Sequence, residues 1–105
     1  MLLSMSNKKI ISSFSIIKRK ALPILKRHDV RRAAIFGSFA RGDETSKSDV
    51  DFLIEYEGKN QSLLDLVALK SDLEEALGRE VDVITYRSIH WRLREHILAE
   101  QIVIL

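Results

Sequence analysis

Two short stretches, Gly37-Ser38-Phe39-Ala40-Arg41-Gly42 and Ser48-Asp49-Val50-Asp51, decide how the rest of this sequence is interpreted. The first follows the apolar run from Val30 to Phe36, which predicts a short strand that the glycine ends. The second opens the run from Val50 to Tyr56, which predicts a second strand. A glycine turn that leads into a short helix can bring backbone N–H groups close to an anion, and the serine hydroxyl adds a donor. We therefore expect a phosphate-binding turn after the first strand.

The second stretch places two carboxylates, Asp49 and Asp51, on one face of the predicted strand, because side chains two positions apart point the same way. Such carboxylates repel each other unless a cation lies between them, and oxygen ligands of this kind suit Mg²⁺. Asp82 lies in the apolar segment from Glu80 to Thr85, which predicts a third strand. If the second and third strands are neighbours, the three aspartates can hold two metal ions, an arrangement suited to phosphoryl transfer. The alternatives are a solvated loop-to-strand junction for the first pair and a water-facing edge position for Asp82.

Arg41 is the remaining candidate in the glycine segment. Its guanidinium can reach the phosphates bound by Gly37 and Ser38 or the approaching acceptor, or it can pair with a carboxylate as a structural ion pair. Both interpretations stay open at this stage.

Helical periodicity surrounds these strands. The segment from Asn7 to His28 predicts a helix that Pro23 kinks or divides, and the segment from Ser62 to Leu77 predicts a second helix that Gly78 ends. Their expected buried faces are formed by Ile10, Phe14, Ile17, Ala21 and Leu25 in the first helix and by Leu63, Leu66, Leu69, Leu73 and Leu77 in the second.

A last helix is expected from the N-cap residue Ser88 to about Gln101, with Trp91 and its leucines in the core. The apolar tail from Ile102 to Leu105 is a candidate short fourth strand, and its exposure would favour homo- or hetero-oligomers. The order helix, strand, strand, helix, strand, helix predicts a small α/β (α+β) fold. In it, helices pack on a mixed β-sheet within one domain spanning residues 1–105.

Composition narrows the function. The chain has 105 residues and no cysteine, which excludes disulfides, cysteine-ligated zinc, iron–sulfur clusters and thiol catalysis. The three histidines lack metal-ligand spacing and receive no role. No apolar run approaches the roughly 20 residues that a membrane helix needs, and the residues after Met1 do not resemble a secretory signal. We therefore expect a cytoplasmic protein without a membrane partner, and Met5 is an alternative start.

The charge is asymmetric. Residues 1–32 carry nine Lys/Arg and one acid, whereas residues 33–105 carry eight Lys/Arg and fourteen acids. A basic first third is compatible with a nucleic-acid or phosphate partner, an acidic protein partner, or the solvated face of an ordinary helix. The solvated face is the preferred interpretation, so direct nucleic-acid binding is not expected.

The glycine–serine turn followed by Ser48-Asp49-Val50-Asp51-Phe52 resembles the signature of the DNA polymerase β-type nucleotidyltransferase superfamily. The Ala-Arg-Gly extension, the Ser-Asp-x-Asp form and the small size resemble the minimal nucleotidyltransferases (MNT proteins), which are encoded with HEPN-domain partners as toxin–antitoxin pairs. The likeness extends from about residue 10 to the end of the chain. Phe39 departs from the pattern, because a polar or small residue is also common at that position.

The resemblance implies roles for individual residues. Gly37 and Ser38 would hold the β- and γ-phosphates of ATP. Asp49 and Asp51 would bind two Mg²⁺ ions, while Asp82 would be the third carboxylate and orient or deprotonate the acceptor hydroxyl. Arg41 matches the family's arginine.

For the whole chain, the resemblance implies transfer of AMP from ATP to a tyrosine of a HEPN toxin, in a type VII-like toxin–antitoxin pair. The alternative is an antitoxin that neutralises its HEPN partner by docking, with little or no catalysis.

Overall fold

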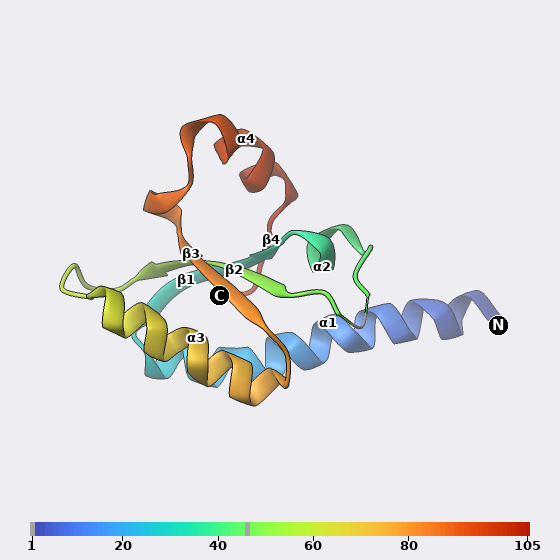
Figure 1. Ribbon diagram of the computed structural model, residues 1–105. Helices are drawn as coiled ribbons and strands as arrows, with labels where there is room; N and C mark the ends of the chain where they lie inside the picture. The colour runs from blue at the N-terminus through green and yellow to red at the C-terminus, as the bar shows by residue number, and fades with distance from the viewer. Residues whose placement is uncertain (1, 46) are drawn as a thin grey trace.

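The protein is described by a computed structural model that covers the backbone of residues 2–45 and 47–105 and the side chains of residues 14–45 and 47–105 (Figure 1). The order of elements agrees with the expected one, with a short helix after the first strand and a short strand at the end of the chain. The elements are α1 (Leu2–Arg27), β1 (Val30–Phe36), α2 (Ser38–Arg41), β2 (Val50–Tyr56), α3 (Leu63–Leu77), β3 (Val81–Thr85), the 3₁₀ helix η1 (Tyr86–Ser88), α4 (Trp91–Glu100) and β4 (Ile102–Val103).

The strands form one mixed sheet in the order β3-β2-β1-β4. β1 is antiparallel to both β2 and β4, whereas β2 and β3 are parallel. A parallel pair needs a long crossover connection, and α3 supplies it. Figure 1 shows α1 and α3 on one side of the sheet and α4 on the other. The mixed α/β fold expected from the sequence is therefore confirmed.

The larger core lies between the sheet and the α1–α3 layer. Ala33 and Ile35 of β1 point into it, while the intervening Ala34 and Phe36 face the α4 side, as alternation along a strand requires. Its fully buried members include Ala21, Leu25, Ala33, Ile35, Val50, Phe52, Ile54, Leu69 and Leu73. The smaller core under α4 consists of Ala34, Leu53, Tyr86 and Ile89.

The end signals of α3 act as expected. The Ser62 side chain accepts a hydrogen bond from the Asp65 backbone, and the Asp65 carboxylate accepts one from the Ser62 backbone in return. Gly78 ends the helix in the left-handed conformation. Leu63 is 75% exposed, against expectation. Leu63 instead lines a cavity together with Tyr56 and Tyr86.

Pro23 lies inside a continuous α1, so of the two expected effects, a kink or a division, the division does not occur. Ala21, Ile24 and Leu25 are buried around the proline, and this packing offsets the missing backbone hydrogen bond. The described lysines and arginines of α1 are exposed, as expected of a solvated face. The expected contribution of Ile10 lies outside the described side chains. None of the helices described is long and apolar enough to cross a membrane.

The start of α4 differs from the prediction. The N-cap is His90, whose Nδ1 accepts a hydrogen bond from the Arg92 N–H at 3.2 Å. Ser88 instead ends η1 and pairs its hydroxyl with that of Thr85 at 2.7 Å. Trp91 is 74% exposed rather than in the core, because α4 reaches the sheet through Ile97 and Leu98 further along the helix, and none of its residues is fully buried.

Candidate functional site

The parallel pairing of β2 and β3 brings the candidate carboxylates together. Asp51 is the register partner of Asp82, and Asp49 comes one residue before β2 begins. Asp51 and Asp82 each stand two residues before a side chain of the smaller core, Leu53 and Ile84 respectively, so both point to the α4 side of the sheet. Asp82 also faces solvent, since β3 is an edge strand. Asp82 therefore lies at the exposed edge of the sheet and next to Asp51 at the same time.

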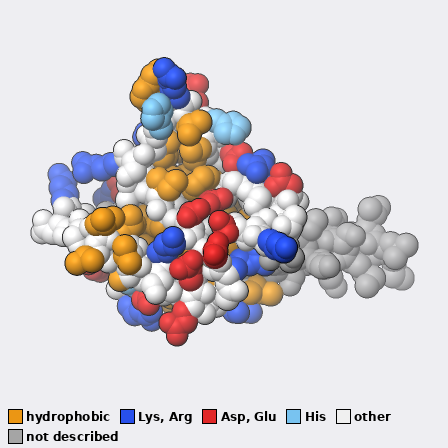
Figure 2. Space-filling view, viewed as in Figure 1, with side chains coloured by type: hydrophobic (Ala, Val, Ile, Leu, Met, Phe, Trp, Pro, Cys, Tyr) orange, Lys and Arg blue, Asp and Glu red, His pale blue; other side chains and the backbone are white. Residues whose placement is uncertain are grey.

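Burial and the neighbouring carboxylates change the chemistry of Asp51. Burial raises the pKa of Asp51 from 3.8 to about 6, and repulsion from Asp82 and Asp49 adds to the shift, while Arg41 opposes it. Figure 2 shows acidic side chains gathered near the middle of this face. A partly buried carboxylate with two acidic neighbours is the donor set that a hard divalent cation would neutralise. Within the described residues, however, no three His, Asp or Glu side chains lie close enough to enclose a metal ion.

The glycine turn lies directly against this carboxylate. Gly37 has φ +75°, and a Cβ atom at this position would collide with the Asp51 carboxylate. Only glycine therefore allows the turn and the aspartate to approach so closely. Phe39, the departure from the family pattern, anchors α2 because its ring is buried in the larger core and lies under the Arg79 guanidinium at 5.0 Å.

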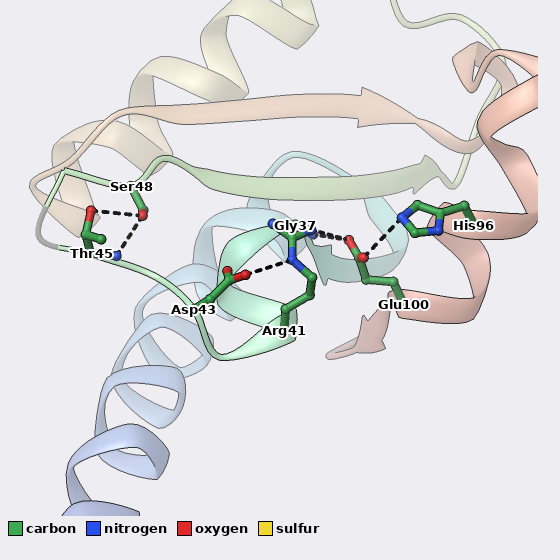
Figure 3. A network of polar contacts seen from close by, with 7 residues as sticks. All are labelled: Gly37, Arg41, Asp43, Thr45, Ser48, His96 and Glu100. Carbon is green, nitrogen blue, oxygen red and sulfur yellow. Dashed lines mark hydrogen bonds and ion pairs between the residues drawn. The ribbon is translucent and has the colours of Figure 1, made fainter.

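A serine turn precedes Asp49. The Ser48 hydroxyl accepts a hydrogen bond from the Thr45 N–H at 2.8 Å (Figure 3). The Val50 N–H donates to the Glu80 carbonyl at 3.1 Å, which joins the starts of β2 and β3. These two contacts hold the chain on both sides of Asp49.

Arg41 forms two ion pairs (Figure 3). Its Nε lies 3.1 Å from Asp43 Oδ2, and its Nη1 lies 3.2 Å from Glu100 Oε1. Hydrogen bonds to Asp43 and then to Glu100 raise the pKa of Arg41 above its ordinary value. The ion-pair interpretation of Arg41 is thus what the structure contains, and it keeps the guanidinium beside the glycine turn.

Glu100 is the residue of this site that the sequence analysis missed. Its Oε1 also accepts a hydrogen bond from the Gly37 N–H at 2.9 Å, and its Oε2 lies 3.5 Å from His96 Nε2. The side chain is only 12% exposed. No local signal marks it, because it stands 63 positions away from Gly37 at the end of α4.

A cavity of about 470 Å³ opens at the opposite end of the sheet. Its lining includes Tyr56, Ser62, Leu66 and Tyr86, from the end of β2, the start of α3 and η1. The aspartates stand at the starts of β2 and β3, so this cavity is separate from them. The size of the cavity does not make it the catalytic centre, since the clustered carboxylates lie elsewhere.

Comparisons with known proteins agree with this arrangement. Residues 19–105 match the family model described as "Polymerase beta, Nucleotidyltransferase". The chain is 56% identical over 89 residues to a Methanocaldococcus jannaschii protein provisionally named a protein adenylyltransferase, covering 85% of this chain and 95% of that protein.

Two solved structures extend the comparison. One, described provisionally as a minimal nucleotidyltransferase, has 40% identity and a TM-score of 0.71, covering 81% of this chain and 86% of that one. The other is a complex of an AMPylated Shewanella oneidensis HEPN toxin with an MNT antitoxin. At 17% identity and a TM-score of 0.68, with 87% of this chain and 71% of that chain covered, it shows the shared fold alone. The match over most of the chain, with the fold and the identities above, establishes that this protein belongs to the polymerase β-type nucleotidyltransferase family.

Proposed function

We propose that this protein is a Mg²⁺-dependent protein adenylyltransferase that transfers AMP from ATP to a tyrosine hydroxyl of a HEPN-domain toxin and thereby acts as its antitoxin. The observation that carries the proposal is the register pairing of Asp51 with Asp82 directly against the Gly37 turn. A carboxylate cluster beside a phosphate-binding turn is what nucleotidyl transfer requires. The name of the related protein adenylyltransferase supports a protein acceptor.

Each residue has a role in this proposal. Gly37, Ser38 and Arg41 bind the phosphates, and Asp49, Asp51 and Asp82 would hold Mg²⁺. When bound, the metal would neutralise charge on the phosphate oxygens. Asp82 also orients the acceptor hydroxyl and accepts its proton as the oxygen bonds to the α-phosphorus and pyrophosphate leaves. Its exposed position on the edge strand leaves room for a protein acceptor.

The surface of α4 supports a protein partner. Trp91 is 74% exposed and Leu93 is 54% exposed, on a helix whose other end, at Glu100, contacts the glycine turn. The Arg92 guanidinium lies 5.1 Å from the Trp91 ring centre, and His90 stacks on the same side chain. Exposed apolar side chains rimmed by polar groups are typical of protein interaction sites. This α4 surface, formed by His90, Trp91, Arg92 and Leu93, is therefore a docking element for the HEPN partner.

The first experiment is intact-mass spectrometry of a HEPN-domain protein after incubation with this protein, Mg²⁺ and ATP. A gain of one or more AMP units that is lost with Asp51→Asn supports the proposal, and peptide mapping identifies the acceptor. An unmodified HEPN protein in all conditions would contradict it.

A docking antitoxin without catalysis is the second candidate. It is favoured by one observation: among the described residues, no three carboxylates lie close enough to enclose a metal ion. A stable complex that suppresses the toxin without AMP transfer would establish this alternative.

A further inference from the structure

One carboxylate joins both halves of the phosphate-binding turn. Glu100 Oε1 accepts hydrogen bonds from the Gly37 N–H at 2.9 Å and from Arg41 Nη1 at 3.2 Å. Figure 3 shows the Glu100 side chain pointing at both groups from the end of α4. We propose that Glu100 is a positioning residue, whose carboxylate holds the Gly37 turn and the Arg41 guanidinium in the arrangement that receives the triphosphate. This inference rests on the proposed function, since it concerns the binding of ATP.

The sheet fixes the position of Glu100. β4 pairs with β1 in antiparallel register, Ile102 opposite Ile35 and Val103 opposite Ala34. Continuing this register by two residues brings Glu100 opposite Gly37. The carboxylate therefore reaches the turn from a backbone tied to the same strand that the turn follows.

The environment of the carboxylate favours positioning over a surface ion pair. The Glu100 side chain is 12% exposed, whereas that of Asp43, the other partner of Arg41, is 60% exposed. Hydrogen bonds to a charged acceptor are stronger than those between neutral groups, and a poorly solvated pair loses less of this strength to water. Glu100 is therefore the better shielded of the two carboxylates that hold the guanidinium, and only Glu100 also contacts the Gly37 N–H.

The alternative role for Glu100 is that its carboxylate occupies the position where a phosphate oxygen of ATP binds, so that ATP must displace it. The hydroxyl of Ser38 favours the positioning role over this alternative. Among the described residues the Ser38 hydroxyl has no hydrogen-bond partner, so the donor next to Gly37 remains available to a phosphate. The two arrangements predict opposite effects of removing the carboxylate.

The test uses Glu100→Gln and Glu100→Ala, with Glu95→Gln as the control on an exposed position of the same helix. Mg²⁺-ATP binding is measured by calorimetry, and KM for ATP and kcat are measured in the AMP-transfer assay. Glu100→Gln keeps an acceptor for the Gly37 N–H but removes the negative charge that pairs with the Arg41 guanidinium. We therefore expect ATP binding about 10-fold weaker. Glu100→Ala loses both contacts and weakens ATP binding about 10- to 100-fold. KM should rise more than kcat falls, and Glu95→Gln should match the wild type.

Unchanged or tighter ATP binding in Glu100→Ala would overturn the proposal, and tighter binding would assign the displaced-carboxylate role instead. A fall in kcat as large as the rise in KM would also overturn it. So would a loss of ATP binding that parallels a fall in melting temperature across the variants, since that indicates general destabilisation. Glu100→Gln guards against an alanine variant that does not fold. Because calorimetry does not depend on transfer, a wild-type protein that binds ATP without modifying the HEPN protein refutes the proposed function and leaves this inference testable.

Discussion

Replacing Asp51 by Asn should stabilise the metal-free protein while it removes activity. The pKa of Asp51 rises from 3.8 to about 6 through burial and then repulsion by Asp82 and Asp49. Because the folded-state pKa lies above the unfolded value, the ionised carboxylate destabilises the fold. The penalty is absent below about pH 4, grows between about pH 4 and 6, and is complete above about pH 6. Asn has nearly the same shape and carries no charge.

The magnitude follows from that shift. At about 1.4 kcal/mol per pKa unit, the penalty has a ceiling of about 3 kcal/mol. The carboxylate is only partly buried, and solvent screening reduces this to about 1–1.5 kcal/mol. For a domain of this size, that corresponds to a melting temperature about 5–10 °C higher for Asp51→Asn at pH 7.5.

The assay is thermal unfolding in EDTA at pH 7.5 and again at pH 4, with Glu57→Gln as a control for an exposed carboxylate at the end of the same region. The stabilisation should appear at pH 7.5, shrink toward zero at pH 4 and be absent in the control. With Mg²⁺ and ATP the order should reverse, because ligand binding stabilises only the wild type. A variant that is equally or less stable than the wild type in EDTA at pH 7.5 would refute the reasoning.

Three further variants probe other parts of the molecule. Gly37→Ala should lower the free energy of unfolding by at least about 1 kcal/mol, because alanine at φ +75° is strained and its Cβ meets the Asp51 carboxylate. Calorimetry should detect no ATP binding by this variant, and normal binding would contradict the close approach of the turn to Asp51. Trp91→Ala should leave the melting temperature and ATP binding unchanged but weaken the HEPN complex at least about 10-fold in a titration, and an unaffected complex would place docking elsewhere. Asp72→Asn should lower the melting temperature at pH 7 and have no effect near pH 2. A hydrogen bond from His28 at 2.7 Å lowers the pKa of Asp72, so the stabilisation by this carboxylate exists above the unfolded pKa and disappears as the carboxylate is protonated. Equal melting temperatures of the two proteins at pH 7 would count against this prediction.

The local features of this protein follow from its sequence alone. The bounds of β1 and β2 agree with the apolar runs that predict them, and α3 ends at its expected glycine. These features depend on side-chain alternation and on caps within a few residues, which are properties of the chain itself. The spacing of Asp49 and Asp51 has the same local origin, although β2 begins at Val50 and leaves Asp49 just outside the strand.

The tertiary structure decided which faces are covered. Leu63 and Trp91 continue apolar patterns, yet both are exposed in the folded chain. Pro23 remains inside α1 because the packing around it outweighs a local breaking signal. Burial is a relation between two elements, and a periodic pattern describes only one of them.

The site divides in the same way. Sequence reasoning placed Asp82 beside Asp51 only on condition that their strands are neighbours, and the parallel β2–β3 pairing met that condition. Glu100 gave no such indication. Its role arises because β4 returns to β1 and brings the end of α4 to Gly37, across 63 positions of chain. The sequence alone identified the candidate residues for phosphate and metal binding. The order of the strands set which carboxylates stand beside them, because only strand pairing brings these distant residues into contact.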